Sequence, residues 1–569
     1  MENEPERPEL AESCAAGIPY SLFTIMASQA FYSFTVVAFV VLTSILMLRQ
    51  RLASSGQQPA TKLHPLKSVP PEQLPKLIQS LLAELPGCVI LQADAAAFQE
   101  AVDYSWAQQN REIIPACIVR PCNAQQLGKA VTILKLEHDR RSHAGASAAG
   151  FFTIRSGGAN PGLGASTVQD GVVIDLSLFR DVTPAVDGST VTVGTGAKWL
   201  DVYQALDKKG LTVMGGRSPP IGVGGLTLQG GISFYSPKFG FVCSNVVSYE
   251  VVLANGNVVV ASASEHPELW RVLKGGSNNF GIVTRFTLRS MPSAPVWVGQ
   301  MFAPAAFQQA KALKVFHDYV NHASSSQPGG FDENAAGPIL SFVYVQSLPL
   351  QLIALHLVYT EAPDDKNWPV YWRATGFASL WSFYRSSEVQ SHTSAVEHIG
   401  RSAPAGTRHM QATTTIRNHA ETMKAAYDIF CHTTTKLRHV KGLLFPFTFQ
   451  AILPAWMNKG HPNVLGLDGC TEPLIILNCS VTWAEAKDDE LVRSTIRHTL
   501  ERIDAAAAAR QSDHPYRFMN YCMEFQRPYE GCGEENLKLM RETSQKYDPD
   551  GLFQRGLAGG FKLDITHKT

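Results

Sequence analysis

Two glycine-rich stretches contain residue types that can bind a phosphate group through the backbone. The first stretch, residues 155–160, reads Arg-Ser-Gly-Gly-Ala-Asn and follows a strand-like run that begins at Phe151. Gly157 and Gly158 have no Cβ, so their N–H groups leave room for the close approach of a diphosphate. Taken alone, glycine pairs are more often ordinary turns. The stretch matches neither a P-loop nor a strand-following GxGxxG sequence, which argues against a Rossmann nicotinamide site.

The second stretch is denser in glycine than the first. Residues 215–231 hold seven glycines in seventeen residues, with Thr227 and Gln229 between them. This density predicts that a ligand or another backbone segment passes very close to the chain here. We therefore treat this loop as a second candidate binding segment.

Short strands and helices alternate from about residue 71 and would have to position these stretches. The predicted helices are residues 71–85, 124–137 and 198–209, and a further helix begins near Pro267 and ends at Gly275. The predicted strands are residues 113–120, 151–155, 172–176, 190–193 and 280–288, with a hairpin at residues 249–260 around an Asn-Gly turn. This alternation predicts α/β or α+β layering.

The amino-acid composition of the chain changes in its second half. Residues 295–510 have more aromatic residues and fewer glycine turns, which indicates a second module, whereas residues 516–563 return to the first pattern. The only glycosylation sequon, at Asn478, lies inside a strand-like run. The absence of an accessible sequon agrees with a body that stays in the cytosol.

The composition indicates one or two large domains with sizeable cores. Of the 569 residues, 45% are hydrophobic and 17% are charged, which is typical of a globular chain. The 49 basic and 49 acidic side chains balance, so nucleic acid is not an expected partner. The ten cysteines include no CxxC pair, which favours buried thiols over disulfides. No metal site is predicted.

The N-terminal region carries a long apolar segment. No charged residue occurs between Glu12 and Arg49, and residues 22–48 are mostly apolar, which suffices for one transmembrane helix of about 20 residues. Acidic residues precede the segment and basic residues follow it. A cleaved signal peptide is therefore disfavoured, and the positive-inside rule places the body of the chain in the cytosol. Residues 1–21 are then a short tail and residues 49–74 a linker.

Seven motifs within residues 75–565 occur in a characteristic order and spacing. They are PACIVRP at 115–121, RSGG at 155–158, GVGG at 222–225, LWRVLKGG at 269–276, NFGIVT at 279–284, FMNY at 518–521 and YDPDGLF at 547–553. In these motifs the chain resembles the FAD-linked oxidoreductases of the vanillyl-alcohol-oxidase superfamily. The specific resemblance is to the berberine-bridge-enzyme-like branch, of fungal type.

The resemblance implies an α+β fold with a two-part FAD-binding domain of the PCMH type. Its parts would be residues 75–294 and the C-terminal segment, residues 511–569. Residues 295–510 would form a substrate domain with an antiparallel sheet flanked by helices. The implied cofactor is FAD, and the implied partners are a small-molecule substrate and oxygen or another electron acceptor.

The resemblance also implies the cofactor contacts. The segment from Arg155 to Asn160 would wrap the FAD diphosphate, residues 218–231 would line the flavin, and residues 281–283 would meet the adenosine part. The implied FAD-binding residues are Arg155, Ser156, Gly157, Gly158, Ala159, Asn160, Ser218, Ile221, Gly222, Gly224, Gly225, Thr227, Gly230, Gly231, Ile282, Val283, Asn520 and Tyr521. The last two would lie near the isoalloxazine edge, although an Asn-Tyr pair on a strand is often simply packed.

Three departures from the family concern the flavin. Many relatives have histidine where Ala159 stands and cysteine where Ser218 stands, and those side chains form bonds to the flavin ring. Alanine cannot form such a bond, and serine does not replace the cysteine thiolate here, so the resemblance implies a dissociable FAD. Ile221 stands where relatives that react well with oxygen carry valine, which implies hindered access of oxygen.

The resemblance implies removal of a hydride from a C–H, C–N or C–O centre with the help of a base. Tyr521 is the preferred candidate, because its implied place is near the flavin ring. Four residues of the predicted substrate module stay open as alternatives: Tyr344, Tyr359, Tyr384 and His409. Lone tyrosines and histidines in a sheet are more often core or rim residues.

Three functions are consistent with these features. The first is an FAD-dependent oxidase or dehydrogenase that acts on a small, fairly apolar substrate such as an intermediate of secondary metabolism. The second is a cyclase on the flavin fold, in which FAD mainly shapes the pocket, and anaerobic turnover without flavin reduction would distinguish it. The third is a non-catalytic, membrane-anchored binding protein, which a colourless purified protein would indicate. The intact glycine stretches favour an enzyme.

Overall fold

The computed structural model describes residues 71–563, apart from residues 146, 148, 349, 365–366 and 401–404. These residues belong to one compact unit, Pro59–Thr569. The predicted anchor at residues 22–48 lies outside the described residues and stays a prediction. Among the helices that are described, none has the length and apolar character needed to cross a bilayer.

A four-stranded sheet carries the first glycine stretch at the end of one strand. Its order is β1-β2-β4-β3, in which β2, β4 and β3 are parallel and β1 is antiparallel to β2. The strands are β1 (Val89–Leu91), β2 (Cys117–Val119), β3 (Phe152–Arg155) and β4 (Val172–Asp175). The helices of this part are η1 (Pro71–Gln73), α2 (Lys76–Glu84), α3 (Ala95–Asp103), α4 (Gln108–Arg111) and α5 (Ala124–His143).

Helices cover both faces of this sheet, so every side chain of β2 and β4 is buried. Val172 and Ile174 pack in the core that includes residues of α2 and α5. The residue between them, Val173, packs in a separate cluster with Phe98 of α3. Successive side chains of a strand point to opposite faces, so those of β4 pack into two different cores. This packing on both faces holds in place the strand ends from which the loops of the site begin.

A six-stranded antiparallel sheet carries the second glycine stretch. Its order is β5-β6-β10-β8-β9, and β7 also pairs with β10. The strands are β5 (Val182–Pro184), β6 (Thr190–Gly194), β7 (Leu211–Val213), β8 (Val246–Val252), β9 (Val258–Ser262) and β10 (Ile282–Pro292). The helices are α6 (Trp199–Asp207), α7 (Val223–Leu228), α8 (Ser236–Phe239), η2 (Cys243–Asn245) and α9 (Pro267–Val272). The predicted hairpin is present as β8 and β9, and its turn residue Gly256 has a φ of 82°.

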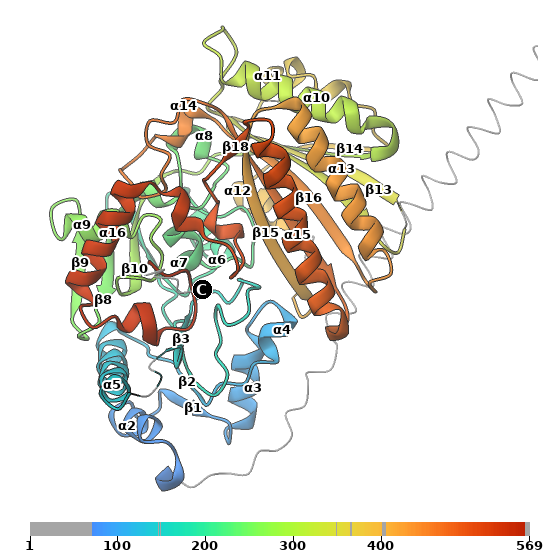
Figure 1. Cartoon of the computed structure of the whole chain (residues 1–569). Helices are drawn as coiled ribbons and strands as arrows, with labels where there is room; N and C mark the ends of the chain where they lie inside the picture. The colour runs from blue at the N-terminus through green and yellow to red at the C-terminus, as the bar shows by residue number, and fades with distance from the viewer. Residues whose placement is uncertain are drawn as a thin grey trace, which may run out of the picture. The chain divides into compact units, whose positions relative to one another are not determined.

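An eight-stranded antiparallel sheet forms the second module, with the long helices α10, α13 and α15 along one side (Figure 1). Its order is β14-β11-β13-β12-β16-β17-β15-β18. The strands are β11 (Val296–Pro304), β12 (Ala335–Val345), β13 (Leu350–Tyr359), β14 (Tyr384–Gln390), β15 (Arg408–Arg417), β16 (Leu444–Ile452), β17 (Leu474–Trp483) and β18 (Asp513–His514). The helices are α10 (Ala305–Ala323), α11 (Val370–Ala374), η3 (Phe377–Ser379), α12 (His392–Gly400), α13 (Ala420–Leu437), α14 (Pro454–Met457), η4 (Ala486–Asp488) and α15 (Asp489–Ala508).

This third sheet has one apolar face and one polar face. Leu340, Phe449 and Leu477 are register neighbours on β12, β16 and β17, and they belong to the core that also holds residues of the long helices. The adjacent row points to the opposite face and is polar along four neighbouring strands: Ser341, Thr448, Asn478 and Thr413. Successive strand residues alternate between the two faces of the sheet. The apolar row therefore packs against the helices, and the polar row faces the other module.

The C-terminal segment returns from the third sheet to the first two sheets. Its elements are η5 (Met519–Tyr521), η6 (Pro528–Gly531), α16 (Glu534–Tyr547) and η7 (Leu552–Gly556). Tyr547 at the end of α16 donates a hydrogen bond to Glu268 of α9 at 2.6 Å. Leu557 forms a parallel bridge with Phe152 of β3. The segment therefore contacts both sheets of the first module.

Three local predictions differ from the structure. Residues 215–231 were expected as one loop, but they include the short helix α7, which forms because Val223 and Leu228 are buried against the second core. The strand expected at residues 113–120 is confined to Cys117–Val119, since prolines flank it on both sides. The Asn520-Tyr521 pair, considered as part of a strand, lies in the 3-10 turn η5.

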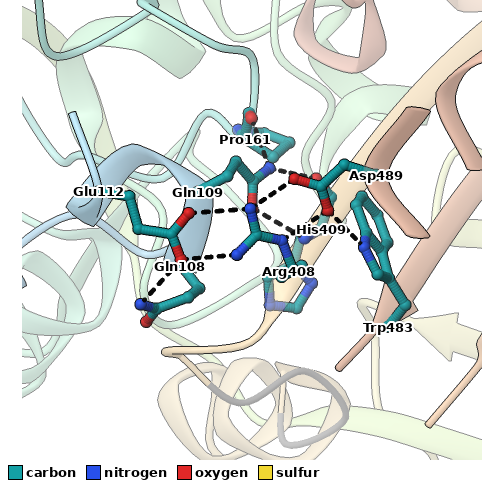
Figure 2. Close-up of polar contacts among 8 residues, drawn as sticks. All are labelled: Gln108, Gln109, Glu112, Pro161, Arg408, His409, Trp483 and Asp489. Carbon is teal, nitrogen blue, oxygen red and sulfur yellow. Dashed lines mark hydrogen bonds and ion pairs between the residues drawn. The ribbon is translucent and has the colours of Figure 1, made fainter. Parts of the chain in front are cut away.

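A buried arginine joins α4 of the first module to the third sheet (Figure 2). Arg408 of β15 donates two hydrogen bonds to Glu112, at 2.6 and 2.9 Å, and two to Asp489 of α15, at 2.6 and 2.5 Å. Trp483 also donates to Asp489, at 2.7 Å. Burial lowers the pKa of Arg408, but the two carboxylates raise it more, so the pKa lies above its usual value. This Arg408 cluster (Arg408, Glu112 and Asp489) is therefore a permanent ionic link between the modules.

Replacing Arg408 should destabilise the fold. Arg408→Met leaves the carboxylates of Glu112 and Asp489 without their cation, and we expect a loss of about 3 kcal/mol in the free energy of unfolding, at the low end for a broken buried pair because both carboxylates keep some solvent contact. Arg527→Met removes an exposed pair with Glu530 and should cost at most about 1 kcal/mol. Denaturant unfolding followed by tryptophan fluorescence compares the variants. Equal losses would contradict a linking role for Arg408.

Candidate functional site

A cavity of about 430 Å³ lies where the first module meets the polar face of the third sheet. The first module contributes both glycine stretches and the segment that leads into β10. The C-terminal turn η5 and three residues of the third sheet complete the wall. Most of its lining residues belong to the segments 156–161, 217–232, 277–283 and 518–521, in which not every residue reaches the cavity, and Ile339, Gln411 and Asn478 come from the third sheet.

Most of the residues that the sequence predicted to bind the cofactor lie in this wall. They are Ser156, Gly157, Gly158, Ala159, Asn160, Ser218, Ile221, Gly222, Gly224, Gly225, Ile282, Val283, Asn520 and Tyr521. Four of the predicted residues do not line the cavity: Arg155, Thr227, Gly230 and Gly231. The structure thus brings together four segments that are separated in the sequence, although a few of their predicted residues do not reach the cavity.

The glycines of the two stretches allow the stretches to touch each other. A Cβ on Gly157 would lie 2.5 Å from the Cα of Gly222, and a Cβ on Gly222 would lie 2.6 Å from the Cα of Gly157. Nearby, a Cβ on Gly224 would lie 2.4 Å from the hydroxyl oxygen of Thr195, whose carbonyl accepts a 2.6 Å hydrogen bond from Ser156. The glycine density therefore reflects close backbone packing.

Gly225 differs from these glycines. Within 4 Å of a Cβ built on Gly225 there is no atom of the described chain outside its immediate neighbours, and the residue lines the cavity. It lies in α7, where glycine gives no conformational benefit. The space in front of Gly225 is thus open to a ligand rather than filled by protein.

Arg155 supports the first stretch from behind. Its Nη2 donates to Asp175 Oδ2 at 3.0 Å, and Arg120 donates to the same oxygen at 3.1 Å. Burial alone would raise the pKa of Asp175, but the two arginines lower it below its usual value. The Arg155 guanidinium also lies over the ring of Tyr104, 5.5 Å from its centroid. Its charge is therefore used to hold the ends of β3 and β4 together.

Residues 106–110 hold the first stretch against the third sheet. The backbone N–H of Trp106 donates to Gly158 at 2.9 Å, and Asn110 donates to the carbonyl of Asn160 at 3.0 Å. Gln109 donates to two carbonyls at once, that of Pro161 at 2.9 Å and that of His409 in β15 at 2.6 Å (Figure 2). The loop and the strand on opposite sides of the cavity are thus joined through one side chain.

Asn520 holds the end of the second glycine stretch in place with two hydrogen bonds. Its Oδ1 accepts from the N–H of Gly231 at 3.0 Å, and its Nδ2 donates to the carbonyl of Leu226 at 3.1 Å. Gly231 has a φ of 72°, and a Cβ on it would lie 2.5 Å from a methyl carbon of Leu226. Asn520 lines the cavity, but both ends of its amide are engaged in holding the end of α7.

Tyr521 lies at a polar corner of the cavity with Arg217. Arg217 Nη2 donates to the hydroxyl of Tyr521 at 3.3 Å and to Gln450 Oε1 of β16 at 3.1 Å. The ring of Tyr521 meets that of Phe518 edge to face, with centroids 4.8 Å apart. Arg217 is the only formally charged residue among the described residues that line the cavity.

None of the four alternative base candidates lines the cavity. Tyr359 donates its hydroxyl to Asp332 at 2.7 Å, and Tyr384 is exposed. Tyr344 is packed at the edge of the large core of the third sheet. His409 stacks on Trp106 with ring centroids 3.7 Å apart. Of the five candidates, the structure brings only Tyr521 to the cavity.

The wall offers polar groups that a bound ligand could satisfy. Four atoms in it have no hydrogen-bond partner within the described chain: Trp106 Nε1, Ser166 Oγ, Asn278 Oδ1 and Asn478 Oδ1. Buried polar atoms without partners are costly. No carboxylate of the described residues lines the cavity, so a diphosphate would meet no repulsion there. These donors and acceptors fit FAD, which carries a diphosphate, hydroxyl groups and ring amides.

Comparison with known proteins assigns the family. The FAD binding domain family matches residues 115–262. The FAD-dependent monooxygenase tpcD of Cochliobolus heterostrophus is 32% identical over 481 residues, which cover 81% of this chain and 87% of that protein. The FAD-dependent monooxygenase sdcF of Emericella nidulans is 30% identical over 479 residues, covering 83% and 95%. The chain belongs to the family of FAD-linked oxidoreductases that includes these two proteins. It is therefore an enzyme of the FAD-linked class.

Solved structures of other flavoenzymes show the same fold. Wild-type BBE-like 1 of Physcomitrella patens has a TM-score of 0.67 at 19% identity, over 86% of this chain and 100% of that chain. The 6-hydroxy-D-nicotine oxidase from Arthrobacter nicotinovorans has a TM-score of 0.64 at 20% identity, over 83% and 97%. These likenesses confirm the predicted α+β, PCMH-type fold.

Several polar residues that line the cavity of this FAD-linked oxidoreductase were not predicted from the sequence, among them Arg217, Asn478 and Gln411. Arg217 could have been found, because it is the only charged residue in the second glycine stretch. Asn478 gave a weaker signal, as a sequon inside a strand-like run. Gln411 gave none, because its place depends on the register of β15 with β17.

Gly157 and Gly225 provide a matched test of this packing. Gly157→Ala forces a Cβ into the backbone of Gly222, and we expect it to cost about 1–3 kcal/mol of unfolding free energy. Gly225→Ala adds the same methyl group in open space within a helix and should be neutral or stabilising by up to about 1 kcal/mol. Thermal unfolding of both variants without added flavin measures the difference. A larger loss for Gly225→Ala would refute this account.

Proposed function

We propose that this FAD-linked oxidoreductase is an oxidase or dehydrogenase that removes a hydride from a small substrate, an intermediate of secondary metabolism. The observation that carries the proposal is the shared cavity. The glycine stretches form one side of it and the polar face of the third sheet forms another, so cofactor and substrate would meet in one partly enclosed space. The relatives named FAD-dependent monooxygenases support oxygen as a reactant, with another electron acceptor as the alternative.

FAD, when bound, supplies a flavin ring that accepts a hydride from the substrate. The backbone N–H groups around Gly157 and Gly158 would hold its diphosphate, as implied by the family resemblance. Ile282 and Val283 would meet its adenosine part, and the unpartnered atoms of Ser166 and Asn278 would add hydrogen bonds. The space in front of Gly225 would receive part of the ligand.

We infer that this FAD is held without a covalent bond. Ala159 and Ser218 both line the cavity, at the two positions where many relatives carry the attaching histidine and cysteine. Neither cysteine nor histidine occurs among the described residues of the cavity wall. Binding would therefore depend on shape and hydrogen bonds alone.

Acid precipitation tests the attachment. Because the attaching histidine and cysteine are absent from the positions of Ala159 and Ser218, we expect the yellow colour to remain in the supernatant. The absorbance of supernatant and redissolved pellet measures the distribution. Flavin that stays on the precipitated protein would overturn the non-covalent assignment without affecting the choice of cofactor.

Tyr521 is the residue that we propose as the proton-transfer group. Its hydroxyl accepts a hydrogen bond from Arg217 and lies in the cavity wall, where it could exchange with the substrate the proton that is released as the hydride leaves. Phe518 packs against its ring and restrains it. Around this corner Ile232 and Ile339 provide apolar surface, which supports a substrate with a substantial apolar part.

Bleaching of the flavin under nitrogen tests both the function and Tyr521. The purified full chain should be yellow, and a true substrate should bleach it. Tyr521→Phe should slow bleaching by roughly 10²–10⁴-fold, the usual contribution of a positioned acid or base, with unchanged flavin content. Tyr384→Phe, at an exposed position outside the cavity, should bleach at the rate of the unmodified enzyme.

The other outcomes discriminate between the remaining functions. Anaerobic product formation without bleaching would favour a cyclase that uses FAD to shape its pocket. A colourless protein that binds no added FAD would favour a non-catalytic binding protein. Bleaching of Tyr521→Phe at the rate of the unmodified enzyme would refute the role of Tyr521 but leave the oxidoreductase proposal intact.

A further inference from the structure

We propose that Arg217 binds a negatively charged oxygen of the substrate, a carboxylate or a phenolate, so that the enzyme selects anionic substrates. The proposal rests on the proposed function, because it assumes that the cavity receives a substrate beside FAD. It goes further by naming the charge of that substrate and the residue that recognises it.

The surroundings of Arg217 leave its charge uncompensated. Its two hydrogen bonds within the described chain go to Gln450 and Tyr521, and both partners are neutral. No carboxylate of the described residues lies within 4.0 Å of its guanidinium nitrogens. Arginine stays protonated at any physiological pH. The cavity therefore carries one positive charge and no negative one.

The unused donors of Arg217 match an anionic oxygen. Both hydrogen bonds start from Nη2, so Nε and Nη1 make no hydrogen bond to the described chain. A guanidinium presents its N–H groups in a planar fork that suits two oxygens of a carboxylate. Because the guanidinium lies in a concave wall with less water around it, its attraction to an anion is stronger than it would be at an open surface. An anionic group of the substrate would therefore complete the coordination that the protein leaves open.

The third sheet provides a second recognition point beside Arg217. Gln450, which Arg217 contacts, is the register partner of Ile476 on β17. Asn478 is two residues further along β17 and so points to the same face as Ile476. Only 7% of Asn478 is exposed, it lines the cavity, and its Oδ1 has no hydrogen-bond partner in the described chain. A hydroxyl or N–H group of the same substrate could donate to it.

The position of Arg217 favours the substrate over the flavin as its partner. Arg217 also lines a small neighbouring pocket of about 30 Å³, together with Ile339, Gln450 and Ala451 of the third sheet. No residue of the segments 156–160 and 218–231 lines that pocket. Although Arg217 belongs to the second glycine stretch, its guanidinium thus reaches the part of the site formed by the substrate module.

Ligand binding to the FAD-loaded full-length enzyme tests the proposal without any turnover. The probes are benzoate as the carboxylate, benzamide as its neutral analogue, and 4-nitrophenolate as the phenolate. Binding is followed by the shift of the visible flavin spectrum and by titration calorimetry. We expect at least one of the two anions to bind at least tenfold more tightly than benzamide, and the preferred anion identifies carboxylate or phenolate as the natural group.

The variants assign this preference to Arg217. Arg217→Met should weaken the preferred anion roughly ten- to hundredfold, the usual effect of losing a charged hydrogen-bond partner, and should leave benzamide unchanged. Arg217→Lys keeps the charge but not the planar fork, and should recover part of the loss. Arg385→Met, which removes an exposed arginine of β14 outside the cavity, should bind all probes as the unmodified enzyme does.

Other results would overturn the proposal. Equal binding of both anions and benzamide, or anion binding that Arg217→Met leaves unchanged, would contradict it. A lower flavin reduction potential in Arg217→Met with unchanged anion binding would assign the charge to the reduced flavin instead. An enzyme that binds FAD and is bleached by a substrate, yet shows no anion preference, would refute this inference alone. A protein that binds no FAD would refute the proposed function itself.

Discussion

The site depends on one contact between two glycine residues. Gly157 follows a strand of the first sheet and Gly222 precedes α7 beside the second sheet, and a Cβ on either would lie within 2.6 Å of the other backbone. This contact, extended by the hydrogen bond from Ser156 to Thr195 and the bridge between Lys198 and Gly222, makes one continuous wall from two separate sheets. Any side chain here would push the sheets apart and open the cavity.

The opposite wall depends on which residues of the third sheet face the long helices and which face the first module. Its apolar rows pack toward the long helices, and the row that includes Thr448 and Asn478 is left to face the first module. Arg408 and Gln109 fix the distance between the two modules by bonding across them. The enclosed space is therefore lined mainly by backbone and small side chains of the first module. Ile339, Gln411 and Asn478 of the third sheet lie opposite, and a single cation, Arg217, lies at the corner where the two modules meet.

Much of the fold and part of the site could be predicted from local sequence. The Asn-Gly hairpin and the glycine stretches were found because turns and close backbone contacts restrict residue type at the position itself. The reason for the glycines was only partly foreseen, since Gly157 contacts protein backbone and Gly225 faces open space. Arg155 was expected to contact the cofactor, but its contacts are with Asp175 and Tyr104, which lie far from it in the sequence.

The sequence by itself determined the FAD-linked family, the α+β fold and the segments that surround the cofactor site, because these follow from short motifs in a fixed order. Only the tertiary structure decided which polar residues complete the cavity. Arg217, Gln411 and Asn478 come together through strand register and through contacts between modules. Arg217 stands out within its glycine stretch, but no local pattern specifies that its guanidinium meets Gln450 of β16 or that Gln411 and Asn478 reach the same cavity. The charge of the cavity, and hence the class of substrate, is a property of the folded chain.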